Sequence, residues 1–380
     1  MRKPIYVTFY ALSILLMLTG CERCDKKKDI KIDKTWKPVA DKDGNRYEST
    51  EIKFDTNGDG VIGENDYKQE ILMENLRTDA TKDGAPTTDP TTGKIITACY
   101  KDMSVNCDTL GALYSVEKIL GQSIKDQINT TAAGGDADGD GLNDEAVKQA
   151  LIAAGYDPTI YTIIPEYNPD LGITGALATQ IPIGTSVGGN SSSYSTSSTL
   201  TYKVLHKGDT IYTPGTTEYT VLKEDDTIYT QGTNGKILVP DMSKINWNTL
   251  SSAAIKGPQG ICPDGYHVPT DGEWKLLELA LGMSFADCQR EGMEVDRGAV
   301  KNLGPVLAAN LKLKYAGYAS ENGTYAQLGE VDVFWTATAG IDENKRDYVW
   351  IRYIDTLQHK GIIRKKHYDK SAFGVRCFKN

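Results

Sequence analysis

The chain has 380 residues, of which 39% are hydrophobic and 24% are charged, so it can bury the core of one large domain with insertions or of two ordinary domains. Its formal charge is −9 and no basic stripe stands out, which argues against a nucleic acid or an anionic membrane surface as a partner. Tyrosine is abundant, with 21 residues against 6 phenylalanines, which suits β-surfaces whose rings keep a polar tip in water.

The first residues read as an export signal. A charged start, an apolar run over 5–18 and the segment Leu18-Thr19-Gly20-Cys21 match the three regions of a signal peptide. The run falls short of the roughly 18 apolar residues that span a bilayer. The alternative is a plain secretory signal with a chance cysteine. Leu-Thr-Gly-Cys resembles the lipobox of bacterial lipoproteins, which implies a diacylglycerol on Cys21 and stable anchoring at the outer membrane or cell surface by two acyl chains.

Seven cysteines in an exported chain are more typical of disulfide bonds than of catalytic cysteines. Without Cys21 six remain, and the sequence alone does not fix how they pair. Cys99 and Cys107 are close enough to close a small loop, so we expect that pair. Cys24 and Cys288 stay unassigned. Residues 22–35 are highly charged and predict a flexible tether, so we expect the folded part to begin near Trp36.

Residues 55–66 carry oxygen side chains at the spacing of a calcium loop. Positions 1, 3, 5 and 12 are Asp55, Asn57, Asp59 and Asp66. The carbonyl of Val61 adds a ligand, and Gly60 permits the sharp turn at position 6. The pattern fits an EF-hand-like loop and resembles the Ca2+ loops of dockerin modules, where aspartate also stands at position 12. The alternative is an Asn/Gly/Asp turn without a metal.

A second such loop spans residues 136–144. Its expected ligands are Asp136, Asp138, Asp140, the carbonyl of Leu142, and Asp144. Position 8 is Asn143 where an EF-hand has a hydrophobe, so this loop resembles thrombospondin-type-3 calcium loops. Neither loop has a matched second helix-loop-helix beside it, which favours structural calcium over a paired switch. We expect the two loops to bind independently, because they lie in different insertions.

Hydrophobic periodicity predicts helices over 108–120, 144–154 and 271–281. The last of these begins with a capping box made by Thr270 and Glu273. Alternation of apolar and polar residues predicts strands over 347–354 and 373–378.

The middle of the chain has a distinct composition. Residues 185–200 are rich in serine, glycine and threonine and read as a linker or a long loop. Two copies of one sequence follow, Tyr202–Thr216 and Tyr219–Thr233. Each copy has two β-rich runs around a turn, so we expect two tandem β-hairpins that form a small antiparallel sheet.

The segment 260–274 reads Gly-Ile-Cys-Pro-Asp-Gly-Tyr-His-Val-Pro-Thr-Asp-Gly-Glu-Trp and resembles the signature of the Fibrobacter succinogenes major paralogous domain. Further segments resemble that family at 41–47 (its opening strand), 69–76, 98–114, 316–318, 334–338, 349–353 and 373–377. In this register the first calcium loop is an insertion at 53–68. The chain departs from the family in having Ile71 and Tyr266 where tryptophan is usual, and in the extra Cys288.

The family is related to C-type-lectin-like folds, which implies a mixed α+β domain closed by pairing of its first and last strands. The resemblance also implies a disulfide between Cys262 and Cys377. We therefore expect a C-type-lectin-like α+β domain with inserted calcium loops and a small antiparallel β insertion. The expected order is signal peptide 1–20, tether 21–35, first part of the domain 36–120, insertion 121–240 and second part 241–380.

No catalytic motif is evident, because the sequence has no nucleophile elbow, Walker loop or zinc-binding helix. His267 lies in the family signature, where a hydrogen-bonded structural role is expected. Relatives of the C-type-lectin-like fold include formylglycine-generating enzymes with paired cysteines, but here the cysteines stand at disulfide positions, so we expect no enzyme.

The leading expectation is a cell-surface binding or adhesion module for a carbohydrate or a surface protein. Rings that could supply stacking platforms for such a ligand are Trp335, Tyr348, Trp350 and Tyr353. The alternative is a structural component of an envelope assembly without a soluble ligand.

Overall fold

The fold is given by a computed structural model that describes residues 30–56, 61–133, 135–136, 141–153, 161–163, 193–196, 200–203, 210–212, 219–221, 228–231, 235–238, 245–283, 288, 290–292, 297–299, 302–368 and 370–380. The architecture is mixed α+β, as predicted. No helix in these ranges is long and apolar enough to cross a membrane.

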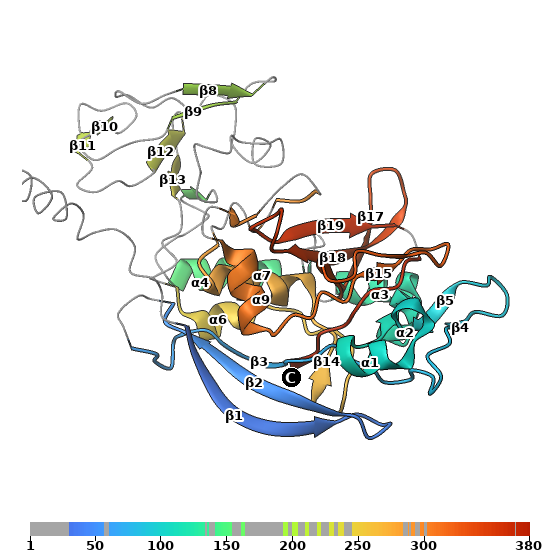
Figure 1. Ribbon diagram of the computed structural model, residues 1–380. Coiled ribbons are helices and arrows are strands. Elements are labelled where there is room, and N and C mark those ends of the chain that lie inside the picture. Colours follow the sequence, from blue (N-terminus) through green and yellow to red (C-terminus); the bar gives the residue numbers. More distant parts are fainter. Residues whose placement is uncertain are drawn as a thin grey trace, which may run out of the picture.

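A five-stranded sheet joins early and late parts of the chain (Figure 1). In order across the sheet, its strands are β1 (Ile30–Ala40), β2 (Arg46–Phe54), β3 (Lys68–Leu72), β20 (Phe378–Lys379) and β14 (Tyr266–His267). The family resemblance implied that the first and last strands pair. The last strand pairs with β3 instead, through Phe378 and Ile71, because β2 lies between β1 and β3.

The first two strands and the turn between them differ from two expectations. The carboxylate of Asp41 accepts the backbone N–H groups of Asp43 and Asn45, both at 2.9 Å, which closes a tight turn. The opening strand expected at 41–47 is therefore a turn followed by the start of β2. β1 begins at Ile30, inside the segment predicted as a tether.

A second sheet is antiparallel throughout and consists of β17 (Val331–Ile341), β18 (Asp347–Asp355) and β19 (Ile363–His367). The strand predicted over 347–354 is confirmed as β18. Val349 lies in one core cluster and Ile354 in another, since alternate side chains leave opposite faces of a strand. Of the residues in the strand predicted over 373–378, only Phe378 belongs to a strand of the structure, β20. Phe373 and Gly374 make isolated bridges.

Four helices lie together beside these sheets (Figure 1). They are α4 (Asp144–Ala153), α6 (Trp247–Ser251), α7 (Asp271–Ala280) and α9 (Leu303–Asn310). The helices predicted at 144–154 and 271–281 are thus confirmed, as is the capping box of α7. Trp274 of α7 is fully buried and packs against Phe334 and Phe378, at ring-centroid distances of 5.9 and 5.4 Å.

The single helix predicted over 108–120 is wrong. The chain forms α1 (Ser104–Leu110), β6 (Leu113–Tyr114) and α2 (Val116–Leu120). Gly111 has φ of +87° and ends α1, and a Cβ there would lie 2.4 Å from the Cβ of Asn75. β6 then pairs with β5 (Ile95–Ala98). The neighbouring elements are β4 (Thr87–Thr88), the short helix η1 (Tyr100–Asp102) and α3 (Ile124–Ala133).

Both predicted disulfides are present. Cys99 bonds to Cys107 and Cys262 bonds to Cys377, with Cα–Cα distances of 5.0 and 6.0 Å. Cys288 is buried and makes no disulfide, and its thiol donates to the carbonyl of Lys275 at 3.6 Å. Burial raises the pKa of this thiol to about 12. Cys21 and Cys24 lie outside the described residues.

The repeat forms strands where they were predicted but pairs them differently. The strands of the two copies are β9 (Leu200–Lys203), β10 (Thr210–Tyr212), β11 (Tyr219–Val221) and β12 (Ile228–Gln231). β8 (Ser193–Thr196) lies in residues 185–200, which were predicted as a linker or a long loop, and β13 (Gly235–Leu238) follows the second copy. β10 pairs with β11, across the two copies, whereas β9 pairs with β8 and β12 with β13. The β-rich composition of the repeat therefore predicted where its strands lie, but it did not predict which strands pair. β7 (Tyr161–Ile163) runs parallel to β13, and β15 (Tyr318–Ala319) pairs with β16 (Tyr325–Ala326).

Candidate functional site

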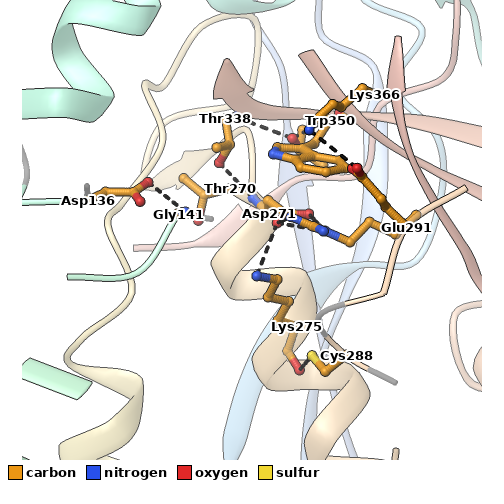
Figure 2. Close-up of polar contacts among 12 residues, drawn as sticks. Asp136, Gly141, Thr270, Asp271, Lys275, Cys288, Glu291, Thr338, Trp350 and Lys366 are labelled. Atoms are coloured by element: carbon orange, nitrogen blue, oxygen red, sulfur yellow. Dashed lines mark hydrogen bonds and ion pairs between the residues drawn. The ribbon is translucent and has the colours of Figure 1, made fainter. Parts of the chain in front are cut away.

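The second predicted calcium loop lies against the first turn of α7 (Figure 2). Asp136 is buried, and its Oδ2 accepts the backbone N–H of Gly141 at 2.7 Å. Gly141 has φ of +83°, and a Cβ on it would lie 2.5 Å from the backbone nitrogen of Gly272. A Cβ on Gly272 would lie 2.3 Å from the carbonyl oxygen of Gly141. The close contact therefore requires glycine at both positions.

A buried carboxylate at position 1, a sharp turn at position 6 and oxygen donors are what a calcium loop needs. Leu142 is buried and makes a β-bridge to Ala254. Asp138 and Asp140 lie outside the described residues, as does the side chain of Asp144, where α4 begins. Among the described residues of this loop, Asp136 is therefore the one carboxylate that could bind a hard cation.

The first predicted calcium loop is closed by Asp66. Its Oδ1 accepts the N–H and the hydroxyl of Thr56, at 2.9 and 2.6 Å, and its Oδ2 accepts the N–H of Gly63 at 2.7 Å. Asp55 is also buried, while the side chain of Val61 is 65% exposed. A cation in this loop would share the Asp66 carboxylate with those donors. The case for a cation in this loop therefore rests on the carboxylate oxygens of Asp55 and Asp66, which are the kind of ligand that calcium prefers.

Two further expected ligands of this loop, Asn57 and Asp59, lie outside the described residues. Within the described part of the chain, no three His, Cys, Asp or Glu side chains form a group that could hold a metal ion.

Below the second loop, α7 carries a buried ionic cluster that sequence reasoning missed. Asp271 Oδ1 accepts Arg352 Nη1 at 2.5 Å, and its Oδ2 accepts Arg364 Nη2 at 2.6 Å. The Nζ of Lys275 lies 3.6 Å from Asp271 Oδ2 (Figure 2). All four side chains are buried. Burial alone would raise the pKa of Asp271, but the adjacent guanidinium groups and ammonium outweigh it and hold this pKa well below its usual range.

Glu278 extends the cluster to a position about two turns from Asp271 along α7. Its Oε1 accepts Arg352 Nε at 2.6 Å, and its Oε2 accepts Arg297 Nη2 at 2.5 Å. Asp271 and Glu278 thus each bind cations from other segments, and removing one partner of such a network is strongly destabilising. One signal in the sequence is Arg352, which stands among apolar residues in the strand predicted over 347–354.

The predicted ring platform is packed inside the molecule. Trp335, Tyr348, Trp350 and Tyr353 are only 0, 6, 4 and 9% exposed. The Arg364 guanidinium lies 3.4 Å from the centroid of the Trp350 ring, and Lys366 pairs with Glu291 at 3.3 Å beside it (Figure 2). These rings support the core and the ionic cluster, and they do not form an open stacking surface.

His267 has the structural role that was predicted. It is buried, with Nε2 2.8 Å from both carboxylate oxygens of Glu273 and Nδ1 2.7 Å from Asn380 Oδ1. Burial would raise the pKa of Glu273, but its hydrogen bond to His267 and its charged neighbours outweigh this and lower the pKa. The histidine therefore joins the capping box of α7 to the last residues of the chain.

A polar pocket of about 530 Å³ opens between the β1–β2 turn, α2 and residues 259–264. On its wall the Asp79 carboxylate binds two ammonium groups, Lys42 at 2.6 Å and Lys118 at 2.7 Å. Gln259 donates to Asp264 at 3.0 Å on the opposite segment. Burial acts to raise the pKa of Asp79, but the two lysines outweigh it and lower the pKa. The sequence did not predict this pocket, because its walls are far apart in the chain.

Comparison with known proteins supports the family resemblance for part of the chain. Residues 193–379 match the family model described as the Fibrobacter succinogenes major domain. This range holds the signature 260–274 and the closing segments, and it includes α7, the second sheet and the last strand. No curated protein and no solved structure matches the chain.

Proposed function

We propose that this chain, which carries the Fibrobacter succinogenes major domain in residues 193–379, is a lipid-anchored surface protein that binds a carbohydrate or a surface protein without catalysis. The export signal and the lipobox-like segment ending at Cys21 support the anchor. The finer C-type-lectin-like class is part of this proposal, supported by the signature and by the Cys262–Cys377 disulfide.

The observation that carries the proposal is the polar pocket beside Cys262. Ligand sites are concave and carry a few placed polar groups. Here the ammonium groups of Lys42 and Lys118 can donate, the carboxylates of Asp79 and Asp264 can accept, and Gln259 can do both. A ligand rich in hydroxyl groups matches such a mixed wall, since each hydroxyl both donates and accepts.

Calcium is the proposed resident ion, held by the two loops as a structural cation. Asp136 in one loop and Asp55 and Asp66 in the other supply hard oxygen donors that are buried. The ion would neutralise carboxylates that otherwise repel one another. Chelation with EGTA should therefore lower the melting temperature of the wild-type chain, whereas an unchanged melting temperature would leave both loops as acidic turns.

A glycan array tests the binding function. The protein without its lipid should bind a defined set of glycans, and Asp79→Ala combined with Lys118→Ala should weaken that binding about tenfold or more. The matched control removes an ion pair outside the pocket, Glu145 with Lys148, and should bind as the wild type does. A blank array together with co-purifying envelope proteins would favour the alternative, a structural component of an envelope assembly.

A further inference from the structure

The polar pocket that carries the proposed function has an excess of negative charge. Its lining holds four carboxylates and two ammonium groups. The carboxylates are those of Asp41, Asp79, Glu117 and Asp264, and the ammonium groups are those of Lys42 and Lys118. The charge that a ligand meets at each point of the wall therefore depends on which of these groups are already paired with one another.

Both ammonium groups of the pocket are paired with one carboxylate. Lys42 Nζ lies 2.6 Å from Asp79 Oδ1, and Lys118 Nζ lies 2.7 Å from Asp79 Oδ2. The hydrogen bond to Asp79 and the charges of Asp43 and Asp41 raise the pKa of Lys42. An acidic group on a ligand would have to compete with these carboxylates for the two lysines.

Two of the other three carboxylates are engaged as well. Asp41 accepts four hydrogen bonds, three of them within its own turn and one from the hydroxyl of Tyr47 at 2.6 Å. The carboxylate of Glu117 lies 3.9 Å from the ammonium group of Lys370. Neither group is therefore as open to a ligand as the remaining carboxylate of the lining.

That remaining carboxylate belongs to Asp264, which is exposed. It accepts the neutral amide of Gln259 at 3.0 Å, and within the described part of the chain it has no ion pair. An ionised carboxylate has about four lone-pair sites, so one neutral donor leaves room for a charged donor from a ligand. Asp264 is thus the point of the pocket where a cation is favoured most.

The loop that carries Asp264 is held in place before a ligand binds. Cys262 in this loop is tied to the last residues of the chain by its disulfide. The N–H of Ile261 donates to the carbonyl of Ile119 in α2 at 3.1 Å, and a Cβ on Gly260 would overlap that same carbonyl. Both walls of the pocket are therefore joined, which lowers the ordering cost of binding.

We propose that the pocket selects sugars that carry a free amine over acetylated and acidic sugars. This inference rests on the proposed carbohydrate binding and names the class of sugar. The protonated amine donates to the Asp264 carboxylate, while ring hydroxyls meet the Asp79 wall. A charge-assisted hydrogen bond is roughly twice as strong as a neutral one, so the amine adds more affinity than an acetamide does. A ligand carboxylate is disfavoured by the excess of negative charge.

Calorimetric titration of the full chain in detergent, below the pKa of the sugar amine, tests this selectivity. The probes are β-1,4-linked trimers of glucosamine, of N-acetylglucosamine and of glucuronic acid. The glucosamine trimer should bind about tenfold more tightly than the N-acetylglucosamine trimer, and the glucuronic acid trimer should bind most weakly. Asp264→Asn keeps an acceptor for Gln259 but removes the charge, so the ratio of the first two affinities should fall close to one. The control Asp108→Asn, at an exposed residue outside the pocket, should keep the ratio.

A second variant tests the opposite wall. Asp79 has φ of +58°, a left-handed conformation that asparagine also tolerates. Asp79→Asn should therefore preserve the backbone while it releases Lys42 and Lys118 from their shared carboxylate. Binding of the glucuronic acid trimer should then strengthen about tenfold. Unchanged weak binding of that trimer would contradict the role given to the pairing of the two lysines.

The outcomes separate the selectivity from carbohydrate binding itself. Equal binding of the glucosamine and N-acetylglucosamine trimers by the wild type, or a preference that Asp264→Asn leaves unchanged, would overturn the selectivity and leave carbohydrate binding in place. Binding of none of the trimers would also overturn it. The glycan array then decides separately whether the pocket binds carbohydrate at all.

Discussion

Arg376 is a fully buried arginine that joins three segments. Its Nη1 donates to the carbonyls of Leu72 and Leu311 at 3.1 and 2.8 Å, and its Nη2 donates to Asn75 Oδ1 at 2.7 Å. Burial lowers the pKa of this guanidinium to about 10, although the charge of Asp332 acts to raise it. One side chain thus connects the end of the chain to β3 and to the residue that follows α9.

Replacing Arg376 with methionine should lower the free energy of unfolding by about 3–5 kcal/mol, because it leaves buried acceptors and Asp332 without their cation. Urea unfolding measures this as a lower midpoint with an unchanged slope. The matched control is Arg346→Met, whose exposed pair with Asp342 should contribute under about 1 kcal/mol. Equal effects of the two substitutions would contradict the role given to Arg376.

Asp271 predicts how stability depends on pH. Its folded pKa is held well below the usual value, whereas the unfolded chain takes up a proton on Asp271 near pH 3.9. The free energy of unfolding should therefore hold above about pH 5 and fall as the pH drops below about 4. In the Asp271→Asn variant, the free energy of unfolding should fall less steeply with decreasing pH than in the wild type. The exposed control Asp108→Asn should show the same fall as the wild type. A wild-type Asp271 carboxyl resonance that titrates near pH 4 would show the assignment to be wrong.

For single residues, the sequence predicted the roles of those whose partners are near in the chain. The Thr270 and Glu273 capping box and the bond of His267 to Glu273 depend on contacts within six residues, whereas the bond of His267 to Asn380 spans 113 residues and was not predicted. The ionic cluster was missed because Arg352 and Arg364 stand 81 and 93 residues from Asp271. They meet only after the second sheet packs on α7.

Among the elements, the long periodic ones were predictable, whereas the break near Gly111 and the pairing of the short repeat strands were not. α7 and β18 follow their patterns over most of their length. The break at Gly111 is set by the close approach of Asn75, a contact that periodicity does not contain. The pairing of β10 with β11 depends on which neighbour is nearest in space, and the repeat offers two equivalent choices.

The two disulfides should differ in their contribution to stability. In the chain-entropy model, Cys262–Cys377, with a sequence separation of 115, stabilises by about 5 kcal/mol, and Cys99–Cys107, with a separation of 8, by about 2–3 kcal/mol. Paired Cys→Ala substitutions compared by urea unfolding measure the difference. Peptide mapping without reduction should recover both pairs bonded, and alkylated cysteines at these positions would refute the assignment.

For the whole molecule, the α+β class was predictable from motifs, but the extent of the core was not. Residues 121–240 were predicted as one insertion, and these boundaries remain a prediction. The first part of that range packs on the core: Gln127 of α3 donates to the carbonyl of Ala337 at 2.6 Å, and Leu142 lies in a core cluster. These contacts join distant segments, so composition along the chain gave no sign of them.

The proposed lipid anchor is also tested on the whole molecule. Cys21→Ala should abolish partitioning into the detergent phase and labelling by radioactive palmitate, because both acyl chains depend on that cysteine. Cys24→Ala is the matched control, three residues further along, and should still be labelled. A Cys21→Ala protein that stays in the detergent phase would point to another means of membrane attachment.

The place of β20 has a consequence for biogenesis. The strand lies between β3 and β14, and its neighbours Val375 and Cys377 accept the N–H groups of Leu76 and Leu72 at 3.2 and 3.0 Å. Residues 375–379 are synthesised after every element they join. The five-stranded sheet therefore stays divided, with the sides of β3 and β14 unpaired, until that segment arrives. In the proposed exported protein, this order would postpone the final folding step to the far side of the membrane, which suits export in an unfolded form.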